Sequence, residues 1–106
     1  MKECTIEDHL VAMVESYGGE CVKFSSLGDQ DLPDRLCFLP IHKPYGGLLL
    51  VEVKKPGESP RESQIKRMRD FARLGFEVCW IKSKIGAAEA IMRDRRPGSR
   101  AYWINP

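Results

Sequence analysis

The most apolar run in the chain, Leu48–Val53 (LLLVEV), also contains an acidic residue, and a basic residue follows it directly. A short run rich in Leu and Val is typical of a strand buried at the centre of a sheet. Because side chains alternate along a strand, Glu52 and Lys54 should project from one face while Val51 and Val53 point to the other. The run therefore predicts a central strand that presents a carboxylate and an ammonium side by side.

The segments before this strand predict a hairpin. Arg35–Leu39 has the length and composition of a strand. His42–Gly47 (HKPYGG), with a proline and two glycines, is typical of the turn out of that strand. A β-hairpin between Arg35–Leu39 and Leu48–Val53 is the natural consequence.

The segments after the central strand predict a crossover. Ser59-Pro60-Arg61-Glu62 carries three helix-start signals, namely a Ser cap, Pro at the first helical position and Glu three residues after the cap. We expect this helix to run to about Leu74, to end at Gly75 and to lead into a strand at Glu77–Ile81. A β-α-β unit follows.

The ends of the chain add helices and strands to this core. Glu3–Tyr17 has apolar residues at helical spacing and is followed by Gly18-Gly19, so we expect an amphipathic helix, and then a strand at Glu20–Phe24. Beyond the crossover we expect a short helix at Ala87–Met92, a basic loop at 93–100 and an edge strand at 101–104. The predicted fold is a single α/β domain over residues 1–106, with a mixed central sheet flanked by helices in the order αβββαβαβ.

Composition sets limits on the class of protein. The chain has 106 residues, of which 42% are hydrophobic and 30% charged, a balance that supports a packed core. A net charge of +2 is too small to indicate a nucleic-acid partner by itself. No segment has the apolar length of a membrane span or a signal peptide, so we expect no membrane association and a cytoplasmic location, either in a bacterium or in the host of a phage.

The four cysteines are far apart and include no CxxC pair. They lie mostly among apolar residues of expected strands, so we interpret them as reduced core residues. Zinc ligation or a disulfide would need a convergence in space that the sequence does not show. These cysteines are Cys4, Cys21, Cys37 and Cys79.

A second carboxylate is expected beside Glu52. Asp34 stands at the start of the preceding strand, where a hairpin would bring it close to Glu52. Two carboxylates and the backbone carbonyl of Val53 are hard oxygen ligands of the kind that suit Mg²⁺ or Mn²⁺. Without Asp34, the pair of Glu52 and Lys54 would be interpreted as a plain ion pair at the end of a strand.

Two helices offer further polar groups. In the first helix Glu3 falls within the apolar arc and Glu7 at its edge, so Glu3 is the preferred candidate for an inward carboxylate and Glu7 the alternative. The alternative for Glu3 is that it lies on a frayed, exposed helix end and has no functional role. In the second helix Gln64 shares the apolar face, where its amide could meet the active site or make a structural hydrogen bond.

Taken together, Glu3, Pro33-Asp34, Glu52-Val53-Lys54 and Gln64 resemble the PD-(D/E)XK nuclease pattern. More specifically, the chain resembles the VRR-NUC family in stretches that span residues 3 to about 83. One departure is Asp31, where that family often has Gly in a GxPDR loop. The stretches are Gly18-Gly19, Lys23-Phe24, Pro33–Arg35, Val51–Lys54, Gln64 and Leu74-Gly75-Phe76.

The resemblance implies a restriction-endonuclease-like core and hydrolysis of DNA phosphodiesters with Mg²⁺ or Mn²⁺, often at branched, flapped or Holliday-junction structures, by a homodimer. In this chain Asp34 and Glu52 would hold the metal together with the carbonyl of Val53. Glu3 would complete or orient the shell. Lys54 would position the attacking water, and Gln64 would support Lys54 or the water.

A module that keeps the fold and binds nucleic acid or a partner without cutting is the alternative function. Under either function, basic residues near the C-terminus are candidates for phosphate contacts, which would make binding sensitive to salt. These residues are Arg93, Arg95, Arg96 and Arg100.

Overall fold

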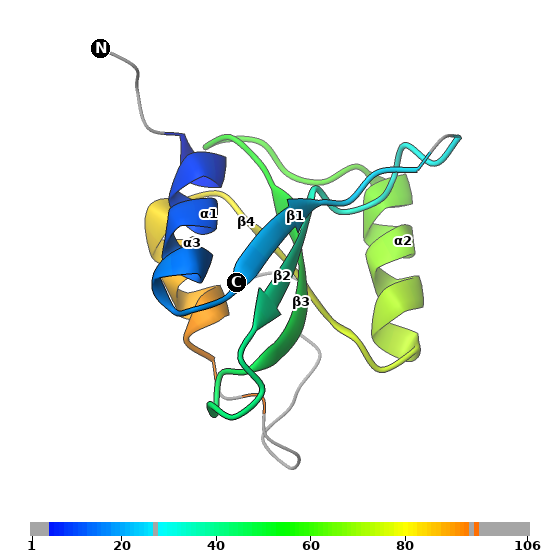
Figure 1. Ribbon diagram of the computed structural model, residues 1–106. Coiled ribbons are helices and arrows are strands. Elements are labelled where there is room, and N and C mark those ends of the chain that lie inside the picture. The colour runs from blue at the N-terminus through cyan, green and yellow to red at the C-terminus, as the bar shows by residue number, and fades with distance from the viewer. Residues whose placement is uncertain (1–4, 27, 94, 96–106) are drawn as a thin grey trace.

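The computed structural model describes residues 5–26, 28–93 and 95. Within these ranges the chain forms a mixed α/β fold, as the sequence predicts (Figure 1). The elements are α1 (Ile6–Ser16), β1 (Glu20–Lys23), β2 (Arg35–Leu39), β3 (Gly47–Val53), α2 (Glu62–Arg73), β4 (Glu77–Ile81) and α3 (Lys84–Ile91).

The four strands form one sheet in the order β1-β2-β3-β4. The pairs β1–β2 and β2–β3 are antiparallel, which confirms the predicted hairpin, and β3 pairs with β4 in parallel, which confirms the β-α-β crossover through α2. In the hairpin, Arg35 lies opposite Val51. Continuing that register by one residue places Asp34 opposite Glu52.

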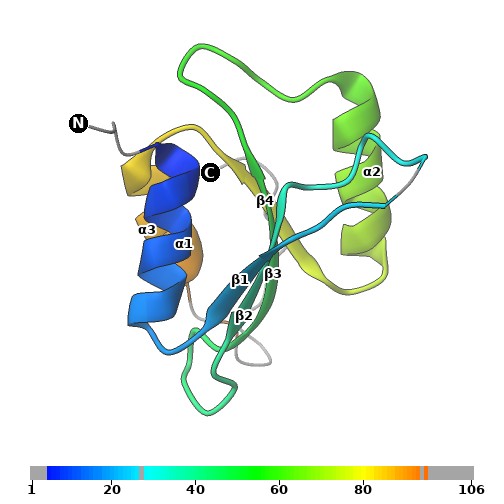
Figure 2. The ribbon, with the colours of Figure 1, turned by 45° about the horizontal axis from the view of Figure 1, so that its top comes forward.

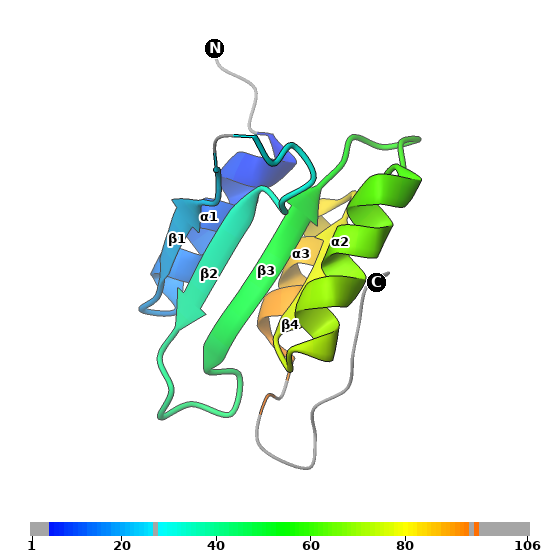
Figure 3. The same ribbon diagram turned by 90° about the vertical axis from the view of Figure 1, so that its right-hand side faces the viewer.

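Helices cover the sheet on both faces. Helices α1 and α3 lie against one face and α2 lies against the other, over the β4 side (Figures 1 and 3). The core beneath α1 and α3 contains Leu10, Val14, Cys37, Leu39, Leu49, Val51, Cys79, Ile81, Ala87, Ala90 and Ile91. The core beneath α2 contains Leu50, Met68, Val78 and Trp80, with Phe24, Leu36, Leu48, Ile65 and Phe71 packed against it.

Helix α1 begins three residues later than the sequence predicts. Thr5 is its N-cap, with the Thr5 hydroxyl accepting a 3.0 Å hydrogen bond from the N–H of Asp8, so the first helical residue is Ile6 rather than Glu3. After the helix, Gly18 has φ +85°. A Cβ on Gly19 would lie 2.2 Å from the carbonyl oxygen of Phe38, so only glycine allows the turn between α1 and β1 to pass this close to β2.

The start of α2 also differs from the prediction. Its N-cap is Arg61 rather than Ser59, and the first helical residue is Glu62. The reason is the Gln64 side chain, whose Oε1 accepts a 2.9 Å hydrogen bond from the Arg61 N–H and so satisfies the first free donor of the helix. The predicted end is confirmed, since Leu74 is the C-cap and Gly75 has φ +97°.

The last helix is longer than predicted. Helix α3 starts at Lys84, because the Ser83 hydroxyl caps it by accepting a 2.9 Å hydrogen bond from the N–H of Gly86. The predicted edge strand at 101–104 and most of the basic loop at 93–100 lie outside the described residues. No helix in the described part of the chain is both long and apolar enough to cross a membrane.

Candidate active site

The β2–β3 hairpin brings Asp34 to the end of β3. Asp34 Oδ2 accepts a 2.8 Å hydrogen bond from the backbone N–H of Val53. This bond holds the carboxylate next to the Glu-x-Lys segment, as the hairpin argument predicts. In an extended strand the N–H and C=O of one residue point to the same side, so the carbonyl of Val53 also faces the side on which Asp34 lies.

Glu52 is the centre of the site. The residue is only 3% exposed, and its Oε2 lies 3.2 Å from Lys54 Nζ and 2.7 Å from Gln64 Nε2. Lys54 and Gln64 therefore converge on the same carboxylate oxygen from β3 and α2. The structure thus places Gln64 against Glu52 itself, whereas the resemblance implied support for Lys54 or the water.

The surroundings of Glu52 make its negative charge unfavourable. Burial, and then the nearby Asp34 carboxylate, raise the pKa of Glu52 to about 7, although Lys54 acts in the opposite direction. Two carboxylates held together in this way are stabilised by any additional positive charge. The charged form of Glu52 would therefore be favoured by a further positive charge next to it.

The other oxygen of Glu52 supports the same conclusion. Oε1 is buried and has no hydrogen-bond partner among the described residues. A buried oxygen without a partner costs free energy unless a ligand satisfies it. A divalent cation fits this position, because Asp34, Glu52 Oε1 and the carbonyl of Val53 are hard oxygen donors. Within the described ranges no cluster of three or more His, Cys, Asp or Glu side chains is found, so water would complete the coordination of Mg²⁺ or Mn²⁺.

Of the two candidate carboxylates of the first helix, Glu7 lies within the described residues. Glu3 lies outside the described residues. Glu7 Oε2 lies 2.7 Å from Arg35 Nε, so Glu7 is engaged in an ion pair that joins α1 to the residue after Asp34. Glu7 also lines a cavity of about 260 Å³ with Thr5, Ile6, Val53, Lys54 and Lys55, on the α1 side of the β3 end.

A set of contacts that the sequence analysis missed fastens the β1–β2 loop to α2, and Figures 1 and 2 show the two side by side. Asp31 Oδ1 accepts a 3.0 Å hydrogen bond from the Ser63 hydroxyl and lies 3.4 Å from Arg61 Nη2. Asp29 Oδ2 lies 3.1 Å from Arg67 Nε. The loop that leads into Asp34 is therefore tied to the helix that carries Gln64. We call these contacts the loop clamp.

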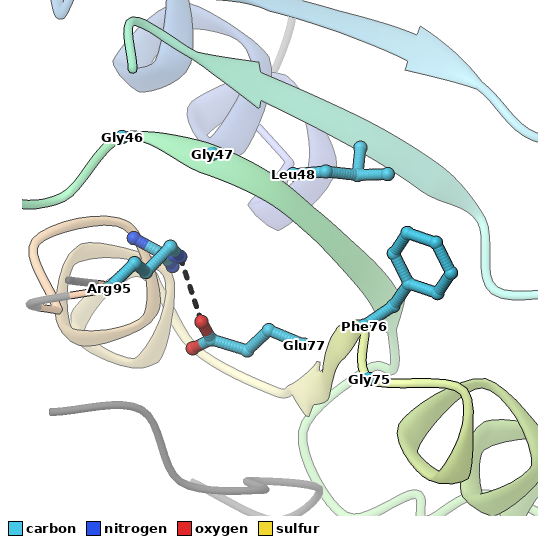
Figure 4. Close-up of a pocket in the computed structure, with 7 residues that line it drawn as sticks. All are labelled: Gly46, Gly47, Leu48, Gly75, Phe76, Glu77 and Arg95. Carbon is cyan, nitrogen blue, oxygen red and sulfur yellow. Dashed lines mark ion pairs between the residues drawn. The ribbon is translucent and has the colours of Figure 1, made fainter. Parts of the chain in front are cut away.

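A second cavity, of about 230 Å³, lies where β3 and β4 begin, at the other end of β3 from Glu52 (Figure 4). On its wall Arg95 Nε lies 3.0 Å from Glu77 Oε2, and the Arg95 guanidinium also donates to the carbonyls of Ala90 and Ile91 at the end of α3. The Arg95 side chain is 4% exposed. The prediction of a phosphate contact is therefore wrong for Arg95, because its donors are used inside the fold. Arg96 and Arg100 lie outside the described residues.

The arrangement as a whole, a mixed sheet with an aspartate of one strand beside the Glu-x-Lys end of the next, defines the class of restriction-endonuclease-like α/β proteins. No protein-family profile matches the chain. The chain is 38% identical over 84 residues to "Putative nuclease p44" of Acyrthosiphon pisum secondary endosymbiont phage 1. The aligned residues cover 79% of this chain and 86% of that relative. A solved structure described as a VRR_NUC domain superposes with a TM-score of 0.72 at 26% identity, over 81% of this chain and 89% of that one.

The chain belongs to the VRR-NUC nuclease family. Both the sequence relative and the solved structure support a nuclease. The resemblance noted from the sequence motifs is thereby confirmed at the level of family and fold.

Proposed function

We propose that the protein is a divalent-metal-dependent endonuclease that hydrolyses DNA phosphodiester bonds and prefers branched structures such as Holliday junctions or flaps. Asp34, Glu52 and the carbonyl of Val53 are the proposed ligands of Mg²⁺ or Mn²⁺. Lys54 acts on Glu52 and on the reacting groups, Gln64 acts through Glu52, and Glu3 is the proposed helix carboxylate.

The observation that carries this proposal is the division of labour between the two oxygens of Glu52. Oε2 already receives Lys54 and Gln64, whereas Oε1 is buried without a partner among the described residues. A purely structural ion pair would use both oxygens or leave the second one in water. A free oxygen on a carboxylate that neighbours Asp34 is the arrangement that a cation site needs.

Each residue then has a distinct task. Asp34 and Glu52 supply the negative charge that attracts the cation, and the Val53 N–H keeps Asp34 Oδ2 in place. Bound there, a divalent cation supplies Lewis acidity and lowers the pKa of a water molecule. Lys54, with its side chain 14% exposed, can orient the attacking water and stabilise the negative charge that develops on the phosphate oxygens. Gln64 holds Glu52 in the orientation that keeps Oε1 available.

The preference for branched DNA and the homodimer rest on the family and on the size of the chain. One domain of this size carries one such site, so symmetric incision of a junction would require two copies. The oligomeric state can be measured by light scattering, with a dimer as the expected result and a monomer as the result that would remove the support for symmetric incision.

A cleavage panel tests the activity. Labelled four-way junctions, flaps, linear duplexes and single strands are incubated with the purified protein and with Mg²⁺, with Mn²⁺ or with EDTA. We expect cleavage with Mg²⁺ or Mn²⁺, none with EDTA, and faster cleavage of branched substrates than of linear duplex. Equal rates on all substrates would contradict the proposed preference for branched DNA.

A negative result can also be interpreted. Metal-independent binding of DNA without cleavage of any substrate in the panel would support the alternative, a binding module on this fold. Glu52→Gln serves as the inactive variant, and Glu89→Gln, on the exposed surface of α3, is the matched control. Cleavage by Glu52→Gln equal to that of the control would contradict the proposed active site.

A further inference from the structure

A pair of thiols lies on the face of the sheet opposite the candidate active site. Cys21 in β1 and Cys37 in β2 are direct partners in the antiparallel register, and their sulfur atoms are 3.6 Å apart. Both pack in the core beneath α1, whereas Glu52 faces α2 through Gln64. The proposed nuclease chemistry uses neither thiol.

The hydrogen-bonding pattern of the two strands determines what this pair can do. The N–H of Phe24 donates to the carbonyl of Asp34 at 3.0 Å, which makes these two residues a hydrogen-bonded pair. Such pairs alternate with non-hydrogen-bonded pairs along an antiparallel ladder, so Cys21 and Cys37, three steps further along, form a non-hydrogen-bonded pair. The Cα atoms of such a pair are about 4.5 Å apart, within the range that a disulfide spans. The sulfur atoms can therefore bond after side-chain rotation alone.

The two thiols differ in access. Cys21 is only partly buried, whereas Cys37 is 0% exposed. A hydrogen bond from Cys37 and then the positive charge of Arg35 lower the pKa of Cys21, although burial and Glu7 oppose them, and the same coupling and burial raise the pKa of Cys37. Cys21 is thus the thiol that a reagent from solution reaches and the one that more readily becomes the thiolate.

We propose that Cys21 and Cys37 form a modification site at which low-molecular-weight disulfides generate an intramolecular cross-strand disulfide. The Cys21 thiolate attacks one sulfur of the reagent, forms a mixed disulfide and releases one thiol. Cys37 then attacks the Cys21 sulfur, and the second thiol leaves. The two protein thiols lose two electrons and two protons, and the reagent disulfide gains them as it becomes two thiols.

The position of the bond gives it a structural consequence. It would close the segment between residues 21 and 37, which contains Asp29 and Asp31 of the loop clamp as well as Asp34. A disulfide that closes a loop of about 15 residues restricts the unfolded chain and stabilises the folded one. We expect the oxidised protein to melt at a temperature higher by roughly 5 °C or more.

The test uses the full chain with Cys4→Ser, so that the other three cysteines are the remaining thiols. The folded protein is equilibrated with mixtures of oxidised and reduced glutathione, quenched with an alkylating reagent and mapped by peptide mass spectrometry. We expect a peptide that joins Cys21 to Cys37, a free Cys79, and a melting temperature that returns to its starting value on reduction. Cys79→Ala is the matched control and should leave the cross-link unchanged.

Three results would overturn the proposal: a glutathione adduct on Cys21 that does not resolve, a bond to Cys79, or full alkylation of both thiols after oxidation. Cys21→Ser should abolish the cross-link and the rise in melting temperature. Because Cys37 is in the core, Cys37→Ala is expected to reduce stability, so its melting temperature is not the readout. The readout is the glutathione adduct on Cys21, which should persist because no second thiol displaces the glutathione. This proposal does not depend on the nuclease function. Whether or not the disulfide forms, the interpretation of the cleavage assays stays the same.

Discussion

The side-chain amide of Gln64 joins the start of α2 to Glu52 at the end of β3. Its Nε2 donates to Glu52 Oε2 at 2.7 Å, and its Oε1 accepts from the Arg61 N–H at 2.9 Å. Both ends of the amide are thus used, so the side chain has one orientation. Gln64 is a positioning residue in the proposed mechanism, because it acts through Glu52.

Replacing Gln64 by Leu should weaken both cation binding and cleavage. Groups that orient a metal ligand typically contribute about 10–100-fold to affinity or activity. We expect the Mn²⁺ concentration needed for half-maximal thermal stabilisation to rise by that factor, and kcat to fall by a comparable factor. A merely structural amide would lower the melting temperature without changing the Mn²⁺ midpoint. Gln30→Leu, in the exposed part of the β1–β2 loop, is the control.

Glu52→Gln should separate stability from activity. Burial and Asp34 disfavour the charged carboxylate more than Lys54 favours it, as the pKa of about 7 indicates. In EDTA the neutral variant should therefore melt at the same temperature as the wild type or higher. Cleavage should fall by at least about 100-fold, and stabilisation by Mn²⁺ should disappear, because the cation loses a charged ligand. Preserved Mn²⁺ stabilisation in this variant would contradict the assignment of Glu52 as a ligand.

Lys54→Met should retain cation binding but lose cleavage. The ammonium is 3.2 Å from Glu52 Oε2, on the oxygen that the proposed cation does not use. Removing it leaves Asp34 and Glu52 Oε1 in place, so Mn²⁺ should still raise the melting temperature. Cleavage should fall by about 100-fold to 1,000-fold, as for other groups that stabilise charge in a transition state. Lys43→Met, in the exposed loop between β2 and β3, should be fully active.

Much of the fold follows from short-range signals in the sequence. The strand periodicity places β2 at Arg35–Leu39 and β4 at Glu77–Ile81, and both are confirmed. The helix starts are less predictable because caps compete. The sequence predicts Ser59 as the N-cap of α2, but the N-cap is Arg61, whose N–H donates to Gln64, and the position of Gln64 depends on Glu52 in another element.

The contacts of the candidate site also divide into those that local sequence signals predict and those that they do not. The convergence of Asp34, Glu52 and Lys54 follows from strand alternation and a hairpin, both of which are local. The loop clamp does not, because Asp31 and Ser63 are 32 residues apart and no periodicity relates them. The only signal available was the acidic residue at position 31, where the family often has Gly. The burial of Arg95 was equally hidden, since a basic run is as typical of a nucleic-acid contact as of a helix cap.

Asp31→Asn tests whether the loop clamp positions Asp34. The ion pair with Arg61 is largely exposed to solvent, so its loss should cost the free energy of unfolding less than about 1 kcal/mol. Cleavage should nevertheless fall by about 3-fold to 10-fold, because small displacements of a reacting group are costly. Glu89→Gln, on the exposed surface of α3 and away from the loop clamp, is the control. Equal activity in both variants would show that the clamp has no catalytic consequence.

Arg95→Leu should destabilise the protein without acting on the candidate site. The guanidinium is buried against Glu77 and donates to the carbonyls of Tyr45, Ala90 and Ile91, so its removal leaves a buried carboxylate and several acceptors without these donors. Glu77 keeps its ion pair with Arg93, at 3.2 Å, so the loss in the free energy of unfolding should be smaller than the roughly 3–5 kcal/mol typical of a buried charge left without a partner. Urea unfolding should show that loss, whereas the salt dependence of DNA binding by the folded fraction should match the wild type. A smaller salt dependence would mean that Arg95 contacts phosphate after all; its ion pair with Glu77 (Figure 4) and its 4% exposed side chain argue against that result.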